Sequence, residues 1–499
     1  MPKALLSVFD KTGLVEFAGG LASLGWELIA SGGTAGLLRQ NGLAVTEVAD
    51  YTGSPEILEG RVKTLHPAIH AGLLTRDRPS DRDELTRLGW GPIDLAAVNL
   101  YPFEATIAKV NVTREDAIEN IDIGGVALIR AAAKNSDRVT LVCDPGDYVA
   151  VLEHLQAGGV PLEVRRQLAV KGFKLTAHYD TAISAYLAGD GSETLTLYPA
   201  QALRYGENPH QKATLYSYSP QGTPLGGKVL QGKELSYNNL LDLDAAWRAA
   251  VSFEKTTVAI VKHLSPCGIA SGETLEAAYS AALASDPVSA YGGVVAANRK
   301  IDAATAQAMS SLFIECIIAP GFDEAALKTL ARKKNLRLVD MPDPKIEPDF
   351  ELRSITRGVL KQAVDYGDPP DTAWKVVSER QPTGEEMQAL KFAWKACQHV
   401  KSNAIVFVRG EATVGIGGGQ PNRVDCVRIA IERSGEKARG AVMASDAFFP
   451  FPDSVELAAK AGITAIVHPG GSIRDAESIA MANLAGIAMV TTGVRHFRH

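Results

Sequence analysis

The feature that most constrains this chain is the alternation of short apolar runs with amphipathic stretches over roughly its first 195 residues. The runs 4–8 (ALLSV) and 26–30 (WELIA) have the composition of buried strands, and helical patterns follow them near 14–24 and 35–40. Two more strand-like runs, 93–100 (IDLAAVNL) and 138–144 (RVTLVCD), continue the rhythm. Because β-α-β alternation builds a largely parallel sheet with helices on both faces, the sequence predicts an α/β fold.

The length of the chain calls for more than one domain. Its 499 residues correspond to two to four domains, at roughly 100–200 residues each. A turn-rich segment at 185–198, with Gly189, Asp190 and Gly191, marks the expected boundary, so we predict domains at 1–195 and 196–499. Within the second, 259–261 (AIV) and 284–286 (ASD) are echoed at 404–406 and 444–446, which indicates two tandem α/β subdomains.

Charge and cysteine content exclude several classes of protein. The net charge is -6, from 51 basic and 57 acidic residues, which disfavours a nucleic-acid-binding protein. The N-terminus has no signal-peptide pattern and no apolar run reaches membrane-spanning length, so we expect a cytoplasmic protein without membrane contact. The five cysteines are odd in number and far apart, and form neither a disulfide framework nor a zinc pair.

Loops in the first half carry groups suited to an anion. The segment 31–34 (SGGT) follows a strand and opens a helix, so backbone amides and the helix dipole favour a phosphate there. Taken alone, an ordinary glycine turn with a threonine cap explains it better. In 61–67 (RVKTLHP), an extended period-two pattern would place Arg61 and Lys63 on one face.

Two further loops strengthen the case for a phosphorylated ligand. The segment 99–103 (NLYPF) comes directly after an apolar strand, and 122–125 (DIGG) opens a helix that carries Arg130 and Lys134 on one side. Four such loops fall where an open α/β sheet binds its ligand, which together suggests a phosphorylated substrate.

A mid-chain stretch, 256–268 (TTVAIVKHLSPCG), suggests catalysis. Its β-branched run predicts a strand, which Pro266 and Gly268 would end before a helix at 274–285. In such a strand-loop-helix unit Lys262 and His263 would lie in the ligand crevice. An imidazole beside a cation can accept a proton while the cation stabilises negative charge, although a basic pair on a turn explains this stretch equally well.

Other segments of the second half also look functional. They are 203–210, 236–239, 401–403, 415–423, 448–451, 469–475 and 495–499. The glycine-rich 415–423 lacks the last glycine of a dinucleotide motif and the Lys-Ser/Thr of a P-loop, so neither nicotinamide nor ATP is supported. For the loop groups at 203–210 and 236–239, capping of neighbouring elements is the favoured explanation when they are taken alone. The phenylalanines of 448–451 can form a wall for a flat heterocycle, and the aromatic, cationic tail implies docking.

Longer motifs span nearly the whole chain. They read SVFDKTG, ASGGTA, TEVADYTGSPEILEGRVKTLHPAIHAGLL, VNLYPF, ENIDIGG, AAAKN, LRYGENPHQ, VKHLSPCG, DPVSAYGG, VKSNAI, GIGGGQ, SDAFFPF, PGGSIRD and RHFRH. In this order they resemble the bifunctional purine-biosynthesis family, which joins an IMP cyclohydrolase to an AICAR transformylase.

The resemblance implies two reactions in series. The C-terminal part would transfer a formyl group from 10-formyltetrahydrofolate, a co-substrate, to the amine of AICAR. The N-terminal part would close formyl-AICAR to IMP with loss of water, and neither step requires a metal. The resemblance also implies a methylglyoxal-synthase-like domain followed by two cytidine-deaminase-like subdomains, in a homodimer whose transformylase sites cross the subunit interface.

For formyl transfer, the resemblance assigns the general base to His263. Lys262 would stabilise the oxyanion or protonate the leaving folate nitrogen, and Asn403 would orient the formyl group. The residues that resemble AICAR ligands are Arg204, Tyr205, Asn239, Gly292, Glu315, Phe448 and Arg495. Those that would lie near the folate are Arg423, Asp453, Ser472 and Ile473.

For cyclisation, the resemblance assigns the reacting centre to Lys63, Tyr101, Asp122 and Lys134. Proximity of the carboxamide to the formyl carbon would do much of the work, with these groups moving protons. The substrate ligands that match the family are Ser7, Lys11, Ser31, Gly32, Gly33, Thr34, Arg61, Thr64, Asn99 and Gly124. Two positions depart from it: Phe9 stands where many relatives carry a small hydroxyl residue, and Ser265 replaces an asparagine common in bacterial members.

Two rival functions stay open on the residues alone. A zinc nucleoside deaminase would use His263 and Cys267, but Ser265 stands at the glutamate position and Ala270 at that of the second cysteine. A catalytically silent nucleotide sensor would need the phosphate site but not the proton-transfer groups, so the presence of Lys63 with His263 disfavours it.

Overall fold

The structure, a computed structural model, describes residues 1–189, 191–220 and 222–499, and of Glu59 only the main chain. It divides into two compact units, Met1–Leu195 and Thr196–His499. Of the connector predicted at 185–198, Asp190 lies outside the described residues. The first residues of that segment are helical, because helix α10 continues to Ala188 and ends at Gly189, whose φ of 61° suits glycine.

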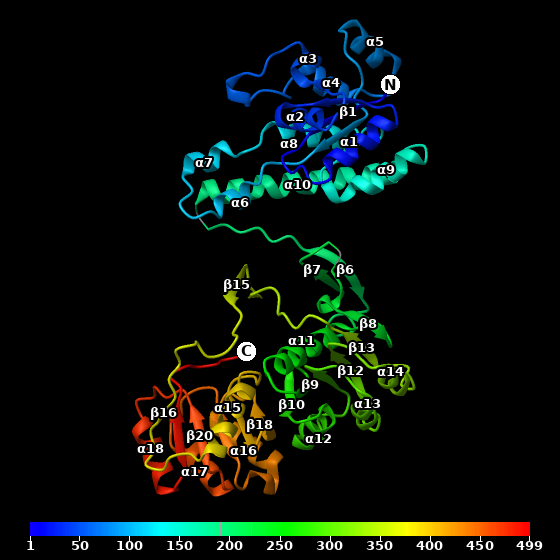
Figure 1. Ribbon diagram of the computed structural model, residues 1–499. Helices are drawn as coiled ribbons and strands as arrows, with labels where there is room; N and C mark the ends of the chain where they lie inside the picture. Colours follow the sequence, from blue (N-terminus) through cyan, green and yellow to red (C-terminus); the bar gives the residue numbers. More distant parts are fainter. Residues whose placement is uncertain (190, 221) are drawn as a thin grey trace. The chain divides into compact units, whose positions relative to one another are not determined.

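The first unit (Figure 1) is built on a five-stranded sheet. Its strand order is β3-β2-β1-β4-β5, and every pair is parallel, as predicted. Its strands are β1 (Lys3–Ser7), β2 (Glu27–Ala30), β3 (Thr46–Glu47), β4 (Leu95–Val98) and β5 (Thr140–Val142). Its helices are α1 (Leu14–Ser23), α2 (Gly32–Gln40), α3 (Val48–Thr52), α4 (Pro67–Leu74), α5 (Pro79–Arg87), α6 (Phe103–Ile107), α7 (Arg114–Glu119), α8 (Gly124–Lys134), α9 (Tyr148–Gln156) and α10 (Leu162–Ala188).

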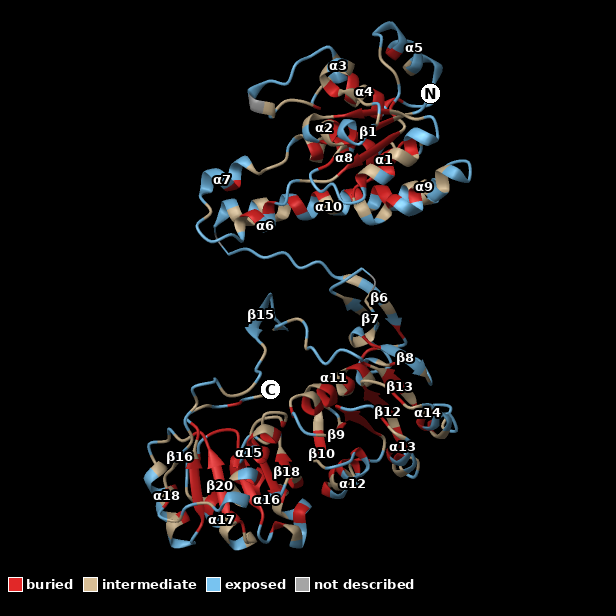
Figure 2. Ribbon diagram, viewed as in Figure 1, coloured by how far each residue is buried: buried red, intermediate tan, exposed pale blue. Residues whose placement is uncertain are grey.

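Helices cover both faces of this sheet. Apolar side chains of α1, α2 and α9 form one core with the strands, and those of α3, α4 and α8 form a second core on the opposite face. Figure 2 shows the strands buried between these layers. The predicted three-layer α/β arrangement is therefore confirmed for this unit.

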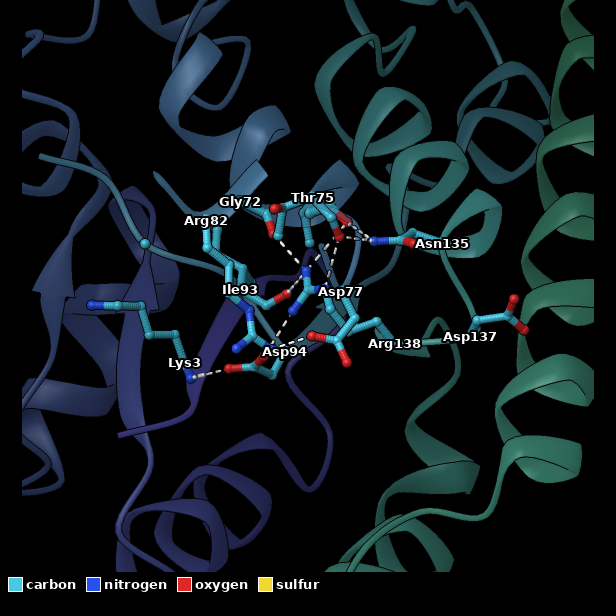
Figure 3. A network of polar contacts seen from close by, with 12 residues as sticks. Lys3, Gly72, Thr75, Asp77, Arg82, Ile93, Asp94, Asn135, Asp137 and Arg138 are labelled. Carbon is cyan, nitrogen blue, oxygen red and sulfur yellow. Dashed lines mark hydrogen bonds and ion pairs between the residues drawn. The ribbon is translucent and has the colours of Figure 1, made fainter. Parts of the chain in front are cut away.

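Arg138 fastens the sheet to its helices at the edge where the strands begin (Figure 3). Its guanidinium donates to Asp94 Oδ1 at 2.7 Å, to the Gly72 carbonyl at 2.6 Å and to the Ile93 carbonyl at 2.8 Å. Asp94 also accepts the Lys3 backbone N–H at 3.0 Å. The ends of α4 and α8 and the starts of β1 and β4 are thus joined, which leaves the opposite edge for the loops that follow the strands.

The second unit is built on a twelve-stranded mixed sheet of order β16-β21-β20-β19-β17-β18-β10-β9-β11-β12-β13-β8. Its strands are β8 (Lys228–Gln231), β9 (Thr257–Lys262), β10 (Ser265–Ser271), β11 (Gly293–Ala297), β12 (Ile314–Ala319), β13 (Arg337–Asp340), β16 (Lys375–Val376), β17 (Ala404–Arg409), β18 (Ala412–Gly418), β19 (Val442–Ser445), β20 (Ala465–His468) and β21 (Ala488–Thr491). Two separate pairs are β6 (Tyr198–Leu203) with β7 (Ala213–Ser217), and β14 (Phe350–Ile355) with β15 (Gly358–Ala363).

Helices again cover both faces of the large sheet (Figure 1). They are α11 (Tyr237–Val251), α12 (Leu275–Ser285), α13 (Ala303–Met309), α14 (Glu324–Leu330), α15 (Gly384–Cys397), α16 (Arg423–Ser434), α17 (Asp453–Ala461) and α18 (Asp475–Leu484). α11 and α15 share one core on one face, whereas α12–α14 and α16–α18 build two cores on the other.

The second unit is a tandem repeat, as the sequence predicts. Each half runs helix, hairpin, helix, then three strands joined by two helices, from α11 to β13 and from α15 to β21. The echo of 259–261 at 404–406 falls in equivalent strands, β9 and β17, but two residues out of register, since 406–408 is the stretch equivalent to 259–261. The echo of 284–286 at 444–446 is wrong, since the first ends α12 and the second ends β19.

One pair of glycines shows the repeat at atomic detail. A Cβ on Gly268 of β10 would lie 2.0 Å from the Ala282 carbonyl of α12. A Cβ on Gly415 of β18 would lie 2.4 Å from the Ala430 carbonyl of α16. Each hairpin is thus pressed against the helix that follows it, and only glycine permits this approach.

The prediction of a strand, a loop and a helix at 256–285 is wrong for the loop, which is a hairpin and a second strand. β9 turns back through two residues into the antiparallel strand β10, which contains Pro266 and Gly268. The register shifts between these two residues, so Pro266 lies at a bulge, where a ladder tolerates proline. The helix after the hairpin is confirmed as α12, capped by Thr274.

Candidate active sites

In the first unit the strand order reverses between β1 and β4, which is where open α/β sheets bind ligands. The loops after these two strands are joined, because Asn99 Oδ1 accepts the backbone N–H groups of Phe9 and Asp10 at 2.6 and 3.0 Å. The ring of Phe9 stands edge-on to that of Tyr101, with centroids 5.4 Å apart. Phe9 thus fills the position of the family's small hydroxyl with an aromatic contact to Tyr101.

The predicted phosphate turn lies in the same crevice. Ser31 is the N-cap residue of α2, and its hydroxyl is 3.2 Å from that of Ser7 at the end of β1. Thr34 Oγ1 accepts the Val8 N–H at 3.3 Å, which fixes the turn against β1. A Cβ on Gly32 would lie 3.3 Å from Lys63 Nζ, so the Lys63 amine reaches the start of α2. Together these groups form a cationic cradle at a helix N-terminus.

Asp122 stands at the N-terminus of α8 beside this cradle. Its carboxylate accepts the Gly125 N–H at 2.6 Å and a backbone hydrogen bond from Tyr101. Burial raises the pKa of Asp122, although these hydrogen bonds act to lower it. Thr64 lies against the same helix start, since a Cβ on Gly124 would be 3.0 Å from its hydroxyl.

Arg61 and Lys63 do not lie as the sequence predicted. Arg61 pairs with Glu119 and Lys63 pairs with Glu56 at 3.1 Å, so the prediction that they share one face of an extended stretch is wrong. The reason is local: Leu58–Gly60 form a 3-10 turn and only Val62 makes a bridge, to Ile57. Lys11 lies at the first loop, its amine 3.4 Å from the Phe9 carbonyl.

Lys134 lies at the far end of α8, about 15 Å from the Asp122 end of that helix. Both residues nevertheless line one cavity of about 560 Å³ between α8 and α10. Arg130 also lines it, with its guanidinium 5.5 Å from the centre of the Phe173 ring. The structure therefore joins Tyr101 to Asp122, places Lys63 at the start of α2, and places Lys134 in the cavity that Asp122 also lines.

In the second unit, most candidate residues lie at one edge of the large sheet. β9, β18, β19, β20 and β21 end at this edge, and β10, β11, β12 and β17 begin there. The candidates at or just beyond these strand ends are Lys262, His263, Gly292, Glu315, Asn403, Arg423, Phe448, Asp453, Ser472, Ile473 and Arg495. The tandem repeat thus brings segments from both of its halves to a common edge.

Lys262 and His263 are held at the tip of the first hairpin. Lys262 Nζ donates to the Tyr291 carbonyl at 2.7 Å. Gly292, next in the chain, has a φ of 72° and donates its N–H to the Phe313 carbonyl at 2.8 Å. His263 is exposed, and its backbone N–H donates to Asp242 of α11 at 3.1 Å.

Asn403 is oriented by a buried charge pair. Its Oδ1 accepts from Arg423 at 2.6 Å and its Nδ2 donates to the Gln420 carbonyl at 2.8 Å. Arg423 also pairs with Asp446 and donates to Ser445 Oγ at 2.9 Å, and both Arg423 and Asp446 are buried. The Arg423 guanidinium therefore acts on Asn403 in this structure, while a contact with folate stays a prediction.

Other candidates make local contacts. Asn239 is in the first turn of α11, where its side chain forms a capping box with Ser236, so the capping alternative describes this segment. Glu315 pairs with Arg337, and the Arg204 guanidinium lies 5.4 Å from the centre of the Tyr205 ring.

The loops after β19 and β20 present apolar surface. Phe448 and Phe451 are exposed, whereas Phe449 is buried in the core, so only part of the predicted wall is available. Arg474 lies over the Phe451 ring at 4.7 Å, and Ile473 is fully exposed. Asp453 and Ser472 each accept a nearby backbone N–H, at 2.7 and 3.1 Å.

The C-terminal tail is docked, as the sequence predicts, and the structure shows that it lies beside Asn403. Ser402 N–H donates to the Arg498 carbonyl at 2.8 Å, and Arg498 N–H donates to Ser402 Oγ at 3.1 Å. His496 is buried between Asp365 and Asp368, with nitrogen–oxygen distances of 2.7 and 2.8 Å. Arg495 lies over the Phe497 ring at 4.4 Å.

Sequence reasoning missed the residues that hold these groups. The contacts above are made by the carboxylates of Asp242, Asp446, Asp365 and Asp368, none of which was a candidate residue. Only Asp446 gave a signal, because it lies in the motif SDAFFPF. The others resemble ordinary surface carboxylates until the fold brings their partners to them.

Three further observations concern cofactors and location. Over the described ranges, the structure shows no group of three His, Cys, Asp or Glu side chains placed to hold a metal ion. Burial raises the pKa of Cys267 to about 12, so its thiol is protonated at neutral pH in this structure. Among the described residues, no helix combines the length and apolar composition needed to cross a bilayer.

Comparison with known proteins gives consistent matches. A family model described as "AICARFT/IMPCHase bienzyme" matches residues 132–433, and one described as "MGS-like domain" matches residues 13–127. The chain is 52% identical over 504 residues to the bifunctional purine biosynthesis protein PurH of Trichormus variabilis, covering 99% of both chains. The protein of the same name from Myxococcus xanthus is 52% identical, and the match covers 99% of this chain and 100% of that one. The one from Listeria innocua is 51% identical, and the match covers 100% of both chains. A solved structure titled "Crystal structure of ForH" has a TM-score of 0.35 at 38% identity, covering 37% of this chain and 98% of that one.

Proposed function

The chain belongs to the AICARFT/IMPCHase bienzyme family of bifunctional purine biosynthesis proteins, and we propose that each of its two units carries one of the two activities. As a member it is both an AICAR formyltransferase and an IMP cyclohydrolase, with an MGS-like first domain. We assign cyclisation to residues 1–195 and formyl transfer to residues 196–499. The family activity implies a formyl donor, which we take to be 10-formyltetrahydrofolate.

In formyl transfer, His263 is the general base for the AICAR amine. This amine is a weak nucleophile because it is conjugated with the imidazole ring, so its proton must leave as the C–N bond forms. The bond from the formyl carbon to the folate nitrogen then breaks, and that nitrogen takes up a proton. Lys262, anchored to the Tyr291 carbonyl, supplies positive charge for the oxyanion, and Asn403 orients the formyl oxygen.

In cyclisation, the carboxamide nitrogen attacks the formyl carbon of the same molecule. The turn at 31–34 with Ser7 and Lys11 holds the phosphate, so the nucleotide lies across the crevice between β1 and β4. Lys63, Tyr101 and Asp122 then polarise the formyl oxygen and move protons until water leaves.

We also propose that the protein acts as a homodimer in the cytoplasm. The five cysteines are all unpaired and buried, which is typical of a reducing compartment. AICAR, formyl-AICAR and the folate are its small-molecule partners, and the net charge of -6 offers no support for nucleic acid as another.

The observation that supports this proposal is that segments of both repeats, one with His263 and one with Asn403, reach the same edge of the large sheet. We expect His263→Ala to lose formyl transfer while it still cyclises supplied formyl-AICAR at nearly the normal rate. A coupled assay that follows tetrahydrofolate and IMP separately measures both. Loss of both activities in a well-folded variant would contradict separate sites.

A further inference from the structure

The turn that carries His263 has an unfavourable backbone for its residues. His263 and Leu264 are the two central residues of the β9–β10 hairpin, and their φ angles are 54° and 63°. Two-residue hairpins with both residues in the left-handed region strongly prefer Asn-Gly or Gly-Gly, because a Cβ is disfavoured there. Neither residue here is of that type, so something outside the turn must hold it.

A single carboxylate provides that restraint. Asp242 Oδ2 accepts the His263 N–H at 3.1 Å, and Asp242 Oδ1 accepts the Leu264 N–H at 2.7 Å. Asp242 projects from α11, a helix packed against β9 and β11 in the first core of this unit. Leu264 is partly buried against the same core, whereas the His263 side chain is left exposed.

The second repeat shows how the same connection is made without this restraint. There β17 returns into β18 through Gly410 and Glu411, and the left-handed position is occupied by Gly410 with a φ of 58°. A glycine suffices where no side chain is needed at the tip. The first repeat keeps a histidine at the equivalent tip and holds the backbone from α11 instead.

We propose that Asp242 is a positioning residue for formyl transfer, which aims the imidazole of His263 by holding the turn beneath it with both carboxylate oxygens. This inference rests on the proposed role of His263 as general base. In this role Asp242 acts through the turn rather than on the amine or the formyl group. Strained backbone that is held from outside is commonly found where a side chain must point in one direction.

The decisive experiment is a rescue. We expect Asp242→Ala to lower kcat for formyl transfer about 100-fold, the loss that a displacement of about 1 Å produces, with the affinity for AICAR changed less than about twofold. Asp242→Asn keeps only one acceptor oxygen and should fall between Asp242→Ala and the unaltered protein. Adding Leu264→Gly to Asp242→Ala should recover about tenfold, because glycine adopts the turn unaided.

Asp244→Ala is the matched control, since this neighbouring carboxylate on α11 bonds to Arg248 at 2.9 Å and not to the turn. Isothermal calorimetry with AICAR shows that the second unit is folded, and single-turnover kinetics give the formyl-transfer rate. Unchanged formyl transfer in Asp242→Ala would overturn the inference. Loss of AICAR binding together with the formyl-transfer rate in Asp242→Ala would also overturn it. So would failure of the added Leu264→Gly to restore any of that rate. Undiminished formyl transfer in His263→Ala would instead overturn the proposed role of His263 as the general base, on which this inference rests.

Discussion

Single residues in both units are held by side chains that need not touch a substrate. Arg423 and Asp446 form a buried pair, and breaking such a pair leaves an uncompensated charge that costs about 3–5 kcal/mol. The pair therefore persists, and Arg423 is fixed in the place where it donates to Asn403. In the first unit, Asn99 and Thr34 do similar work by bonding the loops that carry Phe9 and Val8.

Asp122 predicts a pH dependence for cyclisation. Burial raises its pKa above the ordinary aspartate value of about 3.9, so the carboxylate takes up a proton as the pH falls through that higher value. If Asp122 acts as a base, kcat should fall on the acid side with a midpoint above about 4. A pH profile of cyclisation from pH 4 to 8 checks this.

The Asp122→Asn variant is the control for this profile. It should have a lower kcat and lose the acid limb, because the amide does not titrate. The sign for stability is the opposite of the sign for activity. Since the folded pKa of Asp122 is raised, protonation favours the folded state, and this contribution is lost as the pH rises through that value. An acid limb that is unchanged in Asp122→Asn would assign it to another group.

The candidate residues could be found from the sequence because they lie in contiguous motifs. The residues that position them could not be found in this way. His263 and Asn403 lie within such motifs, whereas Asp242 precedes His263 by 21 residues and meets it only through the turn. The hairpin itself was missed because Pro266 and Gly268 are strand breakers in a local reading. Tertiary contacts override that reading, since Gly268 is required for the approach of α12.

At the scale of elements, the two hairpins of the repeat are set by their glycines. Gly268→Ala and Gly415→Ala should each destabilise the second unit by about 1–3 kcal/mol, the usual cost of overpacking, because the new methyl meets a helix carbonyl. Urea unfolding followed by tryptophan fluorescence measures this. Gly384→Ala is the control, since no atom lies within 4 Å of a Cβ at that position.

The docked tail is a second element whose strength depends on pH. Burial acts to lower the pKa of His496, but its hydrogen bonds to Asp365 and Asp368 outweigh this and raise it. The stabilisation is therefore complete below the unfolded value of about 6.5 and is lost as the pH rises through the raised value. Hydrogen exchange of residues 494–499 between pH 6 and 9, corrected for intrinsic rates, should show decreasing protection.

His496→Gln separates this effect from simple loss of a side chain. The glutamine amide cannot carry a charge. The tail of this variant should therefore be less protected from exchange at pH 6, and its protection should not decrease further as the pH rises. Because the tail pairs with Ser402 next to Asn403, formyl transfer should fall in parallel with protection while cyclisation does not change. Equal protection of the tail in both proteins at pH 6 would contradict a charged clamp.

At the scale of the whole molecule, each unit has hydrophobic cores of its own. Among the described residues, the cores around the first sheet are built from residues before 195 and those around the large sheet from residues after 196. The alternation of apolar and amphipathic segments predicted the α/β class of the first unit, and the echo of short segments predicted it for the second. It did not foretell the strand order of the large sheet, which depends on pairing between residues more than a hundred positions apart.

Separate cores predict separate function. Residues 1–195 expressed alone should fold and cyclise formyl-AICAR at nearly the rate of the full chain, because their sheet and both of its helical layers are complete. Circular dichroism and the IMP assay test this, with the full-length protein as the reference. An inactive or insoluble fragment from an active parent would count against the assignment of activities to units.

The middle of the large sheet is where β10 meets β18, with Ala270 opposite Ala412 in an antiparallel pair. These are equivalent strands of the two repeats, so the contact has the self-complementary geometry of an isologous twofold interface. Two unlinked copies of one repeat would join in the same way. The second unit therefore resembles a dimer whose two copies are joined in one chain. Because both copies are in one chain, they can differ in sequence: one hairpin tip has His263 and the equivalent tip has Gly410.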